Sequence, residues 1–163
     1  MRTHMTSIQN LLLTKTTSSD QRSTDLKARG LWYAIDNAWL DWCASEMPHW
    51  IAKYVYTFEI KESANMLVLN TKEAVNTFAK EYGNELNRYL HCIDWAKVNS
   101  EYDGIEFNPY FYAMRFGPNT MWYNGIDVPS GVIFNTDIIV DLTCQEITDT
   151  VYLEARKQAD EAI

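Results

Sequence analysis

The chain has 163 residues, a formal net charge of −8 and three cysteines, without a CxxC pair. These numbers favour one domain, 1–163, that buries enough surface to fold without a disulfide framework or a metal. They argue against nonspecific nucleic-acid binding, which needs clustered Lys and Arg, and no apolar run approaches the ~18 residues of a membrane span. We therefore expect a soluble, cytoplasmic protein that is a monomer or a small homo-oligomer.

The first half of the chain alternates short apolar runs with helical patterns. In chain order, these patterns predict a frayed start at 1–7, a strand at 8–16, an exposed loop at 17–28, a strand at 29–34, a helix at 36–46, a strand at 51–60 and a short strand at 66–69. The strand at 51–60 has the clearest alternation, and its Tyr54, Tyr56 and Phe58 share one face. We expect these three rings to pack within the sheet.

The second half mixes helices and strands in an irregular order. The patterns predict a helix at 70–83 capped by Asn70, a further helical turn or two at 84–91, a helix at 94–102 capped by Asp94, strands at 104–108, 110–116 and 121–123, a hairpin turn at Asn124-Gly125, strands at 132–135 and 138–142, and a terminal helix at 145–163. Because no βαβ periodicity is present, the predicted fold class is α+β.

The motifs of several common enzyme classes are missing from the sequence. No G-x-G-x-x-G, Walker A, G-x-S-x-G or H-E-x-x-H pattern occurs, which argues against the corresponding nucleotide, hydrolase and zinc sites. Three carboxylates, Asp103, Glu106 and Asp127, fall near predicted strand ends. A pair of them about 5–9 Å apart could act as acid and base, although solvated side chains are the simpler interpretation.

One segment combines a glycine with closely spaced aromatic residues. Gly30 precedes Trp32 and Tyr33, and Trp39 and Trp42 then share one face of the predicted helix. A glycine allows close backbone approach, and aromatic faces suit the stacking of a planar cationic ring such as nicotinamide. Core packing of the same rings is the alternative interpretation.

The residues at 30–34 (GLWYA) resemble the Gly-(Ile/Leu)-Tyr-Phe-Ala strand of the ADP-ribosyltransferases of the poly(ADP-ribose) polymerase type. By this resemblance, Trp32 takes the place of the central aromatic of the family's His-Tyr-Glu triad, which packs on nicotinamide, and Trp42 covers the other side of the ring. Residues 130–135 with Ile138 are similar to the family's last motif. Residues 102–105 (YDGI) look like the opening of an earlier strand in small bacterial and phage relatives.

The resemblance implies split antiparallel and mixed sheets with flanking short helices and a C-terminal helix. It also implies that NAD binds at Gly30, Trp32, Tyr33 and Trp42.

Two catalytic positions depart from the family's pattern. The first-strand His or Arg is expected to be missing, since only Thr14, Lys15 or Thr16 stands near that place. Ser130 replaces the catalytic Glu, whose carboxylate binds the ribose and stabilises the oxocarbenium-like state. A serine hydroxyl cannot supply that charge, so Asp127, three residues earlier, is the candidate substitute.

The function expected from the resemblance is that of an NAD-dependent mono-ADP-ribosyltransferase-like protein, whose acidic surface favours a basic protein as acceptor or partner. A second hypothesis is a catalytically inactive domain of the same fold, acting as a nucleotide- or protein-binding inhibitor or effector. The small size and acidity suit a phage or mobile-element protein of that kind. A third is an unrelated α+β protein whose aromatic residues only pack.

Overall fold

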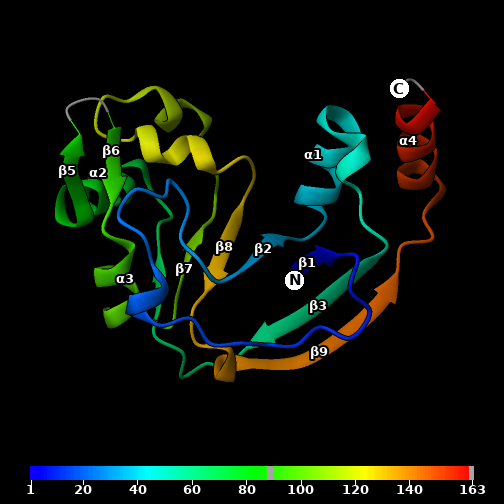
Figure 1. Ribbon diagram of the computed structural model, residues 1–163, viewed down its shortest axis with the longest axis horizontal. Helices are drawn as coiled ribbons and strands as arrows, with labels where there is room; N and C mark the ends of the chain where they lie inside the picture. The colour runs from blue at the N-terminus through cyan, green and yellow to red at the C-terminus, as the bar shows by residue number, and fades with distance from the viewer. Residues whose placement is uncertain (88–89, 162–163) are drawn as a thin grey trace.

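The computed structural model describes residues 1–87 and 90–161, and within them the protein has the predicted α+β class. A mixed seven-stranded sheet forms its centre, and a separate two-stranded sheet lies at one side (Figure 1). In chain order the elements, with η for short 3-10 helices, are β1 (Arg2–Thr6), η1 (Ser18–Asp20), β2 (Leu31–Ile35), α1 (Ala38–Glu46), η2 (Pro48–Trp50), β3 (Tyr54–Ile60), β4 (Met66–Val68), α2 (Lys72–Tyr82), β5 (Gly83–Asn87), β6 (Leu90–Ile93), α3 (Trp95–Glu101), β7 (Gly104–Phe107), η3 (Tyr112–Phe116), η4 (Met121–Gly125), β8 (Ser130–Ile133), η5 (Thr136–Ile138), β9 (Ile139–Glu146) and α4 (Thr150–Glu161).

The large sheet consists of two wings that meet at a short junction. Its strand order is β4-β7-β8-β2-β1-β3-β9, in which only β4 and β7 are parallel neighbours. The central strands β1 and β2 pair at just two positions, Arg2 with Ile35 and Thr3 with Ala34. By contrast, β1 pairs with β3 at five positions and β2 with β8 at four. Beyond this short junction, β1 and β2 separate.

Each wing has its own hydrophobic core, and a third buried cluster of Tyr33, Phe58, Ile133 and Ile138 spans the two wings. The larger core packs α2, α3 and the η3–η4 region against β7 and β8, and it includes the buried rings of Phe107, Trp122 and Tyr123. A smaller core under α1 and the adjoining η2 includes Leu40, Cys43 and Ile51, and side chains of α4 pack against it. In Figure 1, α1 and α4 stand apart from the helices of the other wing.

Several predicted elements are confirmed. The alternation at 51–60 produces β3, with Tyr54, Tyr56 and Phe58 buried on one face. Helix α2 buries Val75, Phe78, Ala79 and Tyr82, as its spacing predicted, although Thr71 rather than Asn70 provides the cap by accepting from the Ala74 amide. Asp94 caps α3 through the Lys97 amide.

The predicted start of the sheet was wrong. Residues 2–6 are not frayed but form β1, because strands on both sides satisfy its backbone groups. The apolar run at 8–16 is an extended coil instead of a strand, and Leu12 is 85% exposed. Tyr56 holds this segment, since its hydroxyl accepts from the Leu11 amide.

The aromatic stretch at 110–123 was also predicted wrongly. It forms the short helices η3 and η4 instead of strands, and Asn124-Gly125 ends η4 instead of forming a hairpin. Its β-prone residues serve core packing, since Trp122 and Tyr123 are fully buried. Tertiary contacts therefore override local strand propensity here.

Two further boundaries differ from the prediction. Residues 84–91 lie in β5 and β6 instead of a helix, except that 88 and 89 fall outside the described residues. Strand β9 continues to Glu146, so the terminal helix begins at Thr150, and the predicted end at 163 lies outside the described range. Among the described residues, no helix is long and apolar enough to cross a membrane.

Candidate functional site

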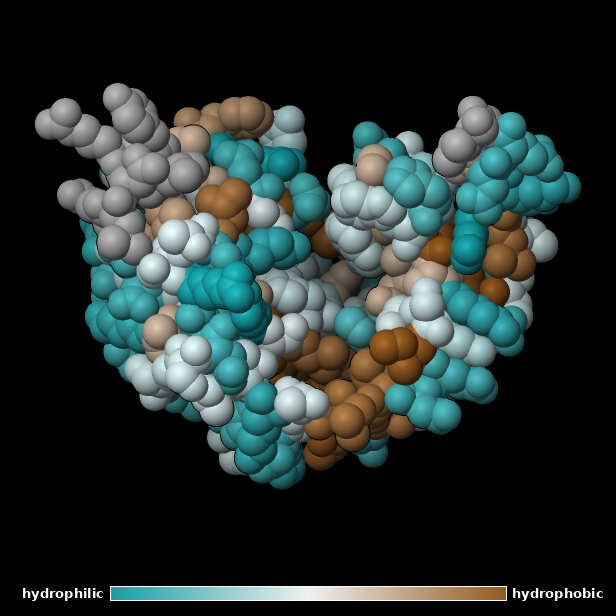
Figure 2. Space-filling model, in the orientation of Figure 1, coloured by the Kyte–Doolittle hydropathy of each residue, from teal (hydrophilic) through white to brown (hydrophobic). Residues whose placement is uncertain are grey.

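A cavity of about 190 Å³ lies at the junction of the two wings, over the point where β1 and β2 separate. Residues from β1, β2, α1 and the two loops before β2 and β8 line it: Thr3, His4, Met5, Lys27, Trp32, Tyr33, Ala34, Trp39, Ile126, Asp127, Val128 and Ser130. The space-filling view shows the hollow between the wings (Figure 2). Its volume is below the ~300–1,000 Å³ of sites for drug-sized ligands, so it suits one ring-sized group of a larger ligand.

Trp32 and Ser130 share one face of the sheet at this cavity. The register pairs Trp32 with Val132 and Ala34 with Ser130. Since directly opposed residues point to the same side, the Trp32 indole and the Ser130 hydroxyl lie on the same face, on neighbouring strands. Ser130 is buried, with 6% exposure. Two contacts fix the position of the indole. Its Nε1 donates to the Ala28 carbonyl at 2.8 Å, and its ring stacks on Phe107.

His4 enters the cavity from β1. Its Nδ1 lies 2.7 Å from the Trp32 carbonyl oxygen. Because a carbonyl can only accept, Nδ1 donates this bond, and the neutral imidazole keeps Nε2 as an acceptor. Burial lowers the pKa of His4 below its ordinary value, and the bond to Trp32 opposes this shift only in part. His4 is therefore a neutral, oriented imidazole at the junction of the two wings.

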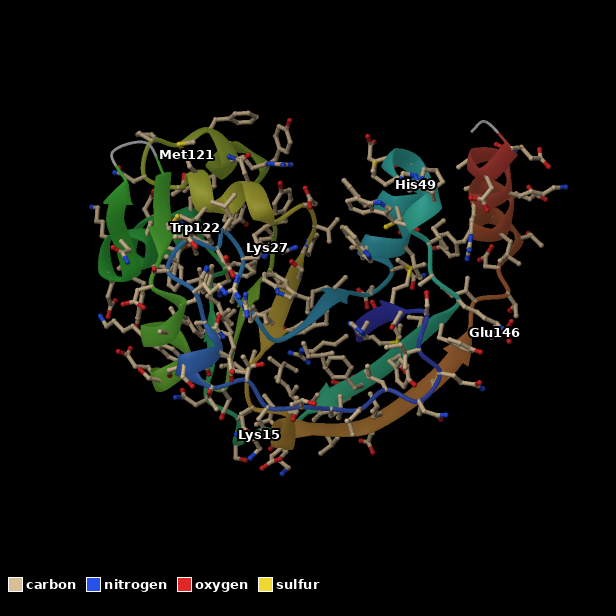
Figure 3. The ribbon with its side chains drawn as sticks, in the orientation of Figure 1. Lys15, Lys27, His49, Met121, Trp122 and Glu146 are labelled. Carbon is tan, nitrogen blue, oxygen red and sulfur yellow. The ribbon has the colours of Figure 1, made fainter. Side chains whose placement is uncertain are left out.

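Lys27 places a positive charge over the ring of Trp32. Its Nζ lies 4.4 Å from the centroid of the Trp32 ring, a cation–π contact. Desolvation in the cleft lowers the pKa of Lys27, while the nearby Asp127 carboxylate raises it. Figure 3 shows Lys27 on the side of the cleft that faces α1 and His49.

Asp127 lies in the loop before β8 and is held by a cation. Its Oδ1 is 3.4 Å from Nη2 of Arg115, whose side chain also donates to Asn124. Both partners are about one-quarter exposed, so this ion pair is partly shielded from water. The carboxylate borders the cavity near Ser130 but is already paired.

Helix α1 supplies the opposite wall through Trp39. The Trp39 and Trp42 rings stack with centroids 4.9 Å apart and planes 8° apart. Trp39 lines the cavity, whereas Trp42 lies behind it and also approaches Trp50. Trp39, and not the predicted Trp42, is therefore among the residues that line the cavity.

Of the remaining two predicted binding residues, Tyr33 lines the cavity and Gly30 does not. Gly30 has φ of +154°, and a Cβ there would collide with the Ile133 carbonyl and the Val132 side chain, so it lets β2 begin close to β8. Tyr33 borders the cavity, but its hydroxyl donates to Glu106 at 2.8 Å and its ring packs edge-on against Phe58.

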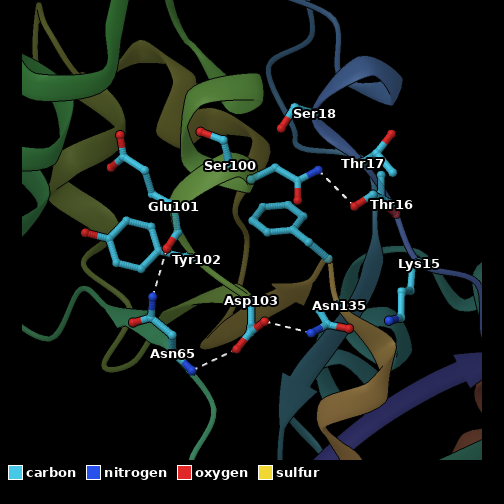
Figure 4. A pocket seen from close by; sticks show the side chains of 12 residues that line it. Lys15, Thr16, Thr17, Ser18, Asn65, Ser100, Glu101, Tyr102, Asp103 and Asn135 are labelled. Carbon is cyan, nitrogen blue, oxygen red and sulfur yellow. Dashed lines mark hydrogen bonds between the residues drawn. The ribbon is translucent and has the colours of Figure 1, made fainter.

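A second, more open hollow of about 380 Å³ lies between residues 15–18, the end of α3 with the residues after it, and the two residues that follow β8 (Figure 4). Its polar groups satisfy one another: Asp103 accepts from the Asn135 amide side chain and from the Asn65 backbone, and Asn99 donates to the Thr16 carbonyl. These bonds tie the segment 102–105, singled out in the sequence, to the end of β8. The hollow thus has a structural explanation and is the weaker candidate for a site.

Eight of the twelve residues that line the cavity were not selected as ligand contacts from the sequence, among them His4, Lys27 and Trp39. His4 was missed because β1 has no apolar pattern, and Lys27 lies in a loop whose path no local signal predicts. Trp39 had a detectable signal, its spacing of three from Trp42. No cluster of three or more His, Cys, Asp or Glu that could hold a metal occurs in the described part of the chain.

Comparison of the chain with models of protein families, with curated proteins and with solved structures gave no match. The role of the cavity is therefore inferred from its own residues.

Proposed function

We propose that this protein is an NAD-dependent mono-ADP-ribosyltransferase-like protein whose cavity receives the nicotinamide end of NAD. The observation that carries the proposal is the convergence of three separate segments on one cavity. The first strand contributes His4, the GLWYA segment contributes Trp32, and the last motif contributes Ser130. These are the strand positions that the family resemblance associates with His, Tyr and Glu of the triad.

The location of β1 supports the proposal, because it offers a candidate for the first-strand His or Arg of the family's pattern. The first-strand His or Arg was expected to be missing because the first strand was placed at 8–16. The actual first strand, β1, contains both Arg2 and His4, and His4 borders the cavity beside Trp32. The separation of β1 from β2 also agrees with the split sheet that the resemblance implies.

The chemistry proposed for the cavity is cleavage of the bond between nicotinamide and ribose. Nicotinamide leaves with the electron pair of the C–N bond, and the acceptor's nucleophile bonds to the ribose carbon and loses its proton. Trp32 and Trp39 flank the ring, and the Ser130 hydroxyl bonds the ribose. Asp127 is the nearest carboxylate on the cavity wall that could stabilise the positive ribose.

One observation favours an inactive binding domain as the second candidate. Ser130 carries no charge, and Asp127 is paired with Arg115 at 3.4 Å. Loss of a preorganised stabilising group typically costs ~10²–10³-fold in rate. A protein with this cavity would then hold NAD with slow or no turnover, as an inhibitor or effector.

The test is direct binding of NAD, followed by release of nicotinamide. We expect millimolar NAD to raise the melting temperature and quench tryptophan fluorescence, because Trp32 and Trp39 line the cavity. Nicotinamide release, measured by chromatography, should fall in Asp127→Ala more than in Ser130→Ala if the protein is an enzyme.

Asp141→Asn, an exposed carboxylate on β9, is the matched control and should leave binding and release unchanged. Binding without release in the wild type would select the inactive domain. Absence of any thermal shift with NAD would reject both forms of the proposal.

A further inference from the structure

We propose that the exposed side of Trp50, together with Glu46, is a docking site for an arginine side chain of a basic polypeptide. The site belongs to the wing of α1 and η2, and neither residue lines the cavity. The proposal goes beyond the proposed function, since it names a class of partner and requires no NAD. Its basis is a half-open tryptophan ring in a segment that carries carboxylates and no cation.

Trp50 belongs to a cluster of three tryptophan rings at α1 and η2. The rings of Trp39 and Trp42 stack on each other, and Trp50 contacts both, with centroids 6.2 and 6.0 Å away and planes tilted by 35° and 41°. His49, which lies on the wing across from Trp122 (Figure 3), adds an edge-on contact at 6.1 Å. These contacts hold the Trp50 ring in position, yet the residue remains 49% exposed. A tryptophan that is held in position and half open is typical of a binding surface.

Glu46 places a negative charge next to this cluster. It follows Trp39 by seven residues and Trp42 by four, so the three side chains share one face of α1. The helix also ends at Glu46, where the negative end of its dipole favours a cation. Glu46 is exposed, and it makes no ion pair with any residue that the structure describes. Its carboxylate is therefore available to accept from a partner.

The charges around the cluster favour a cation over an anion. Residues 30–52 contain three carboxylates and no Lys or Arg, and the next cation, Lys53, is paired with Glu146 at 3.5 Å. The whole chain carries a net charge of −8, so a basic polypeptide is also attracted at long range. Nucleic-acid bases stack on exposed tryptophans too, but this segment offers no cation to their phosphates. A basic polypeptide is therefore the partner that the site fits.

Arginine suits this arrangement better than lysine does. Its planar guanidinium stacks on an aromatic face and bonds a carboxylate through two parallel N–H groups, whereas the lysine ammonium is a strongly hydrated point charge. A guanidinium on the open face of Trp50 gains a cation–π contact, which contributes about two- to fivefold in affinity at an exposed site. The same guanidinium donates to Glu46.

The experiment titrates the protein, in the absence of NAD, with two short peptides, one of alternating arginine and serine and one of alternating lysine and serine. Binding is followed by the tryptophan indole N–H signals in NMR spectra, and Trp50→Phe assigns the Trp50 signal. We expect the arginine peptide to shift this signal and to bind at least about twofold tighter than the lysine peptide. Trp50→Ala should weaken binding of the arginine peptide about two- to fivefold and remove the difference between the peptides.

Glu46→Gln tests the site a second time, because it changes only an exposed side chain and keeps the tryptophan cluster. It should weaken binding of the arginine peptide by about twofold. Phe116→Ala and Glu62→Gln are the matched controls, since Phe116 is 71% exposed on η3 in the other wing and Glu62 is an exposed carboxylate in the turn after β3. Both control variants should bind the two peptides as the wild type does.

Three results would overturn the proposal: equal affinities of the wild type for the two peptides, a Trp50 signal that neither peptide shifts, or losses in the control variants equal to those in Trp50→Ala and Glu46→Gln. A Trp50 signal that moves with protein concentration alone would also overturn it, by showing that a second copy of the chain occupies the surface. Because the titration contains no NAD, each of these results leaves the proposed function to its own test.

Discussion

At the scale of single residues, the cavity depends on which of two stacked tryptophans meets the ligand. Trp39 forms the wall, and Trp42 supports it from behind at 4.9 Å. A flat ring between Trp32 and Trp39 would gain stacking on two faces, whereas Trp42 would act only by holding Trp39 in position.

We therefore expect Trp39→Ala to weaken NAD binding by about three- to tenfold, the usual contribution of one aromatic stacking contact. Trp42→Ala should weaken it less, because Trp42 does not line the cavity, and should lower the free energy of unfolding by about 2–3 kcal/mol, because Trp42 packs against the small core under α1. Calorimetric titration and urea unfolding measure the two effects. If Trp42→Ala weakened binding more than Trp39→Ala and left stability unchanged, the ligand would have to contact Trp42 instead of Trp39.

At the scale of elements, a buried polar network crosses the sheet beneath the cavity. Glu106 on β7 accepts from Tyr33 on β2 at 2.8 Å and from Arg2 on β1, whose Nη2 lies 2.9 Å from the carboxylate. Between them, β8 presents only Gly131, and a Cβ there would collide with the Tyr33 ring. A glycine on β8 thus allows one carboxylate to bind side chains from two strands beyond it, and burial raises the pKa of Tyr33 so that it remains a donor.

We expect Glu106→Gln to lower the free energy of unfolding by about 2–4 kcal/mol, because it removes the negative charge that pairs with the largely buried Arg2 guanidinium. Glu59→Gln is the control. Glu59 meets the same arginine at 3.5 Å but is 57% exposed, compared with 11% for Glu106. Its removal should cost less than about 1 kcal/mol. Equal losses in the two variants, measured by urea unfolding, would refute the structural role of the network.

At the scale of the whole molecule, the two wings depend on a very short junction. Since β1 and β2 pair at two positions only, side-chain contacts help to hold the wings together, among them the apolar cluster of Tyr33, Phe58 and Ile133. Thr3 on β1 helps to join the wings through a hydrogen bond. Its hydroxyl donates at 2.6 Å to the carbonyl of Asp36, which lies between β2 and α1. The cavity lies beside this junction. The early separation of β1 from β2 therefore both shortens their pairing and leaves space for the cavity.

Thr3→Val should lower the free energy of unfolding by about 1–3 kcal/mol, since it keeps the shape but leaves the Asp36 carbonyl without its donor. Thr57→Val is the control, because Thr57 bonds Thr143 at an exposed position between β3 and β9. Its cost should stay below about 1 kcal/mol. If Thr3→Val were neutral in urea unfolding, the junction would have to be held by other contacts.

The sequence by itself determined the elements whose residues carry a clear local period. The alternation in β3, the helical spacing of Val75, Phe78, Ala79 and Tyr82 in α2, and the Asp94 cap of α3 are properties of neighbouring residues, so they could be predicted. Trp32 and Tyr33 were also correctly placed on a strand, and both border the cavity, whereas Gly30 lies just before β2 and outside the lining.

Only the tertiary structure decided the strand status of residues 2–6, the coil at 8–16 and the helices η3 and η4. A polar segment such as RTHMT becomes a central strand when two partners far along the chain satisfy its backbone, and no local pattern encodes those partners. For the same reason, the meeting of His4, Lys27, Trp32 and Ser130 could not be predicted. Their proximity results from long-range pairing of β1, β2 and β8 and from the path of one loop.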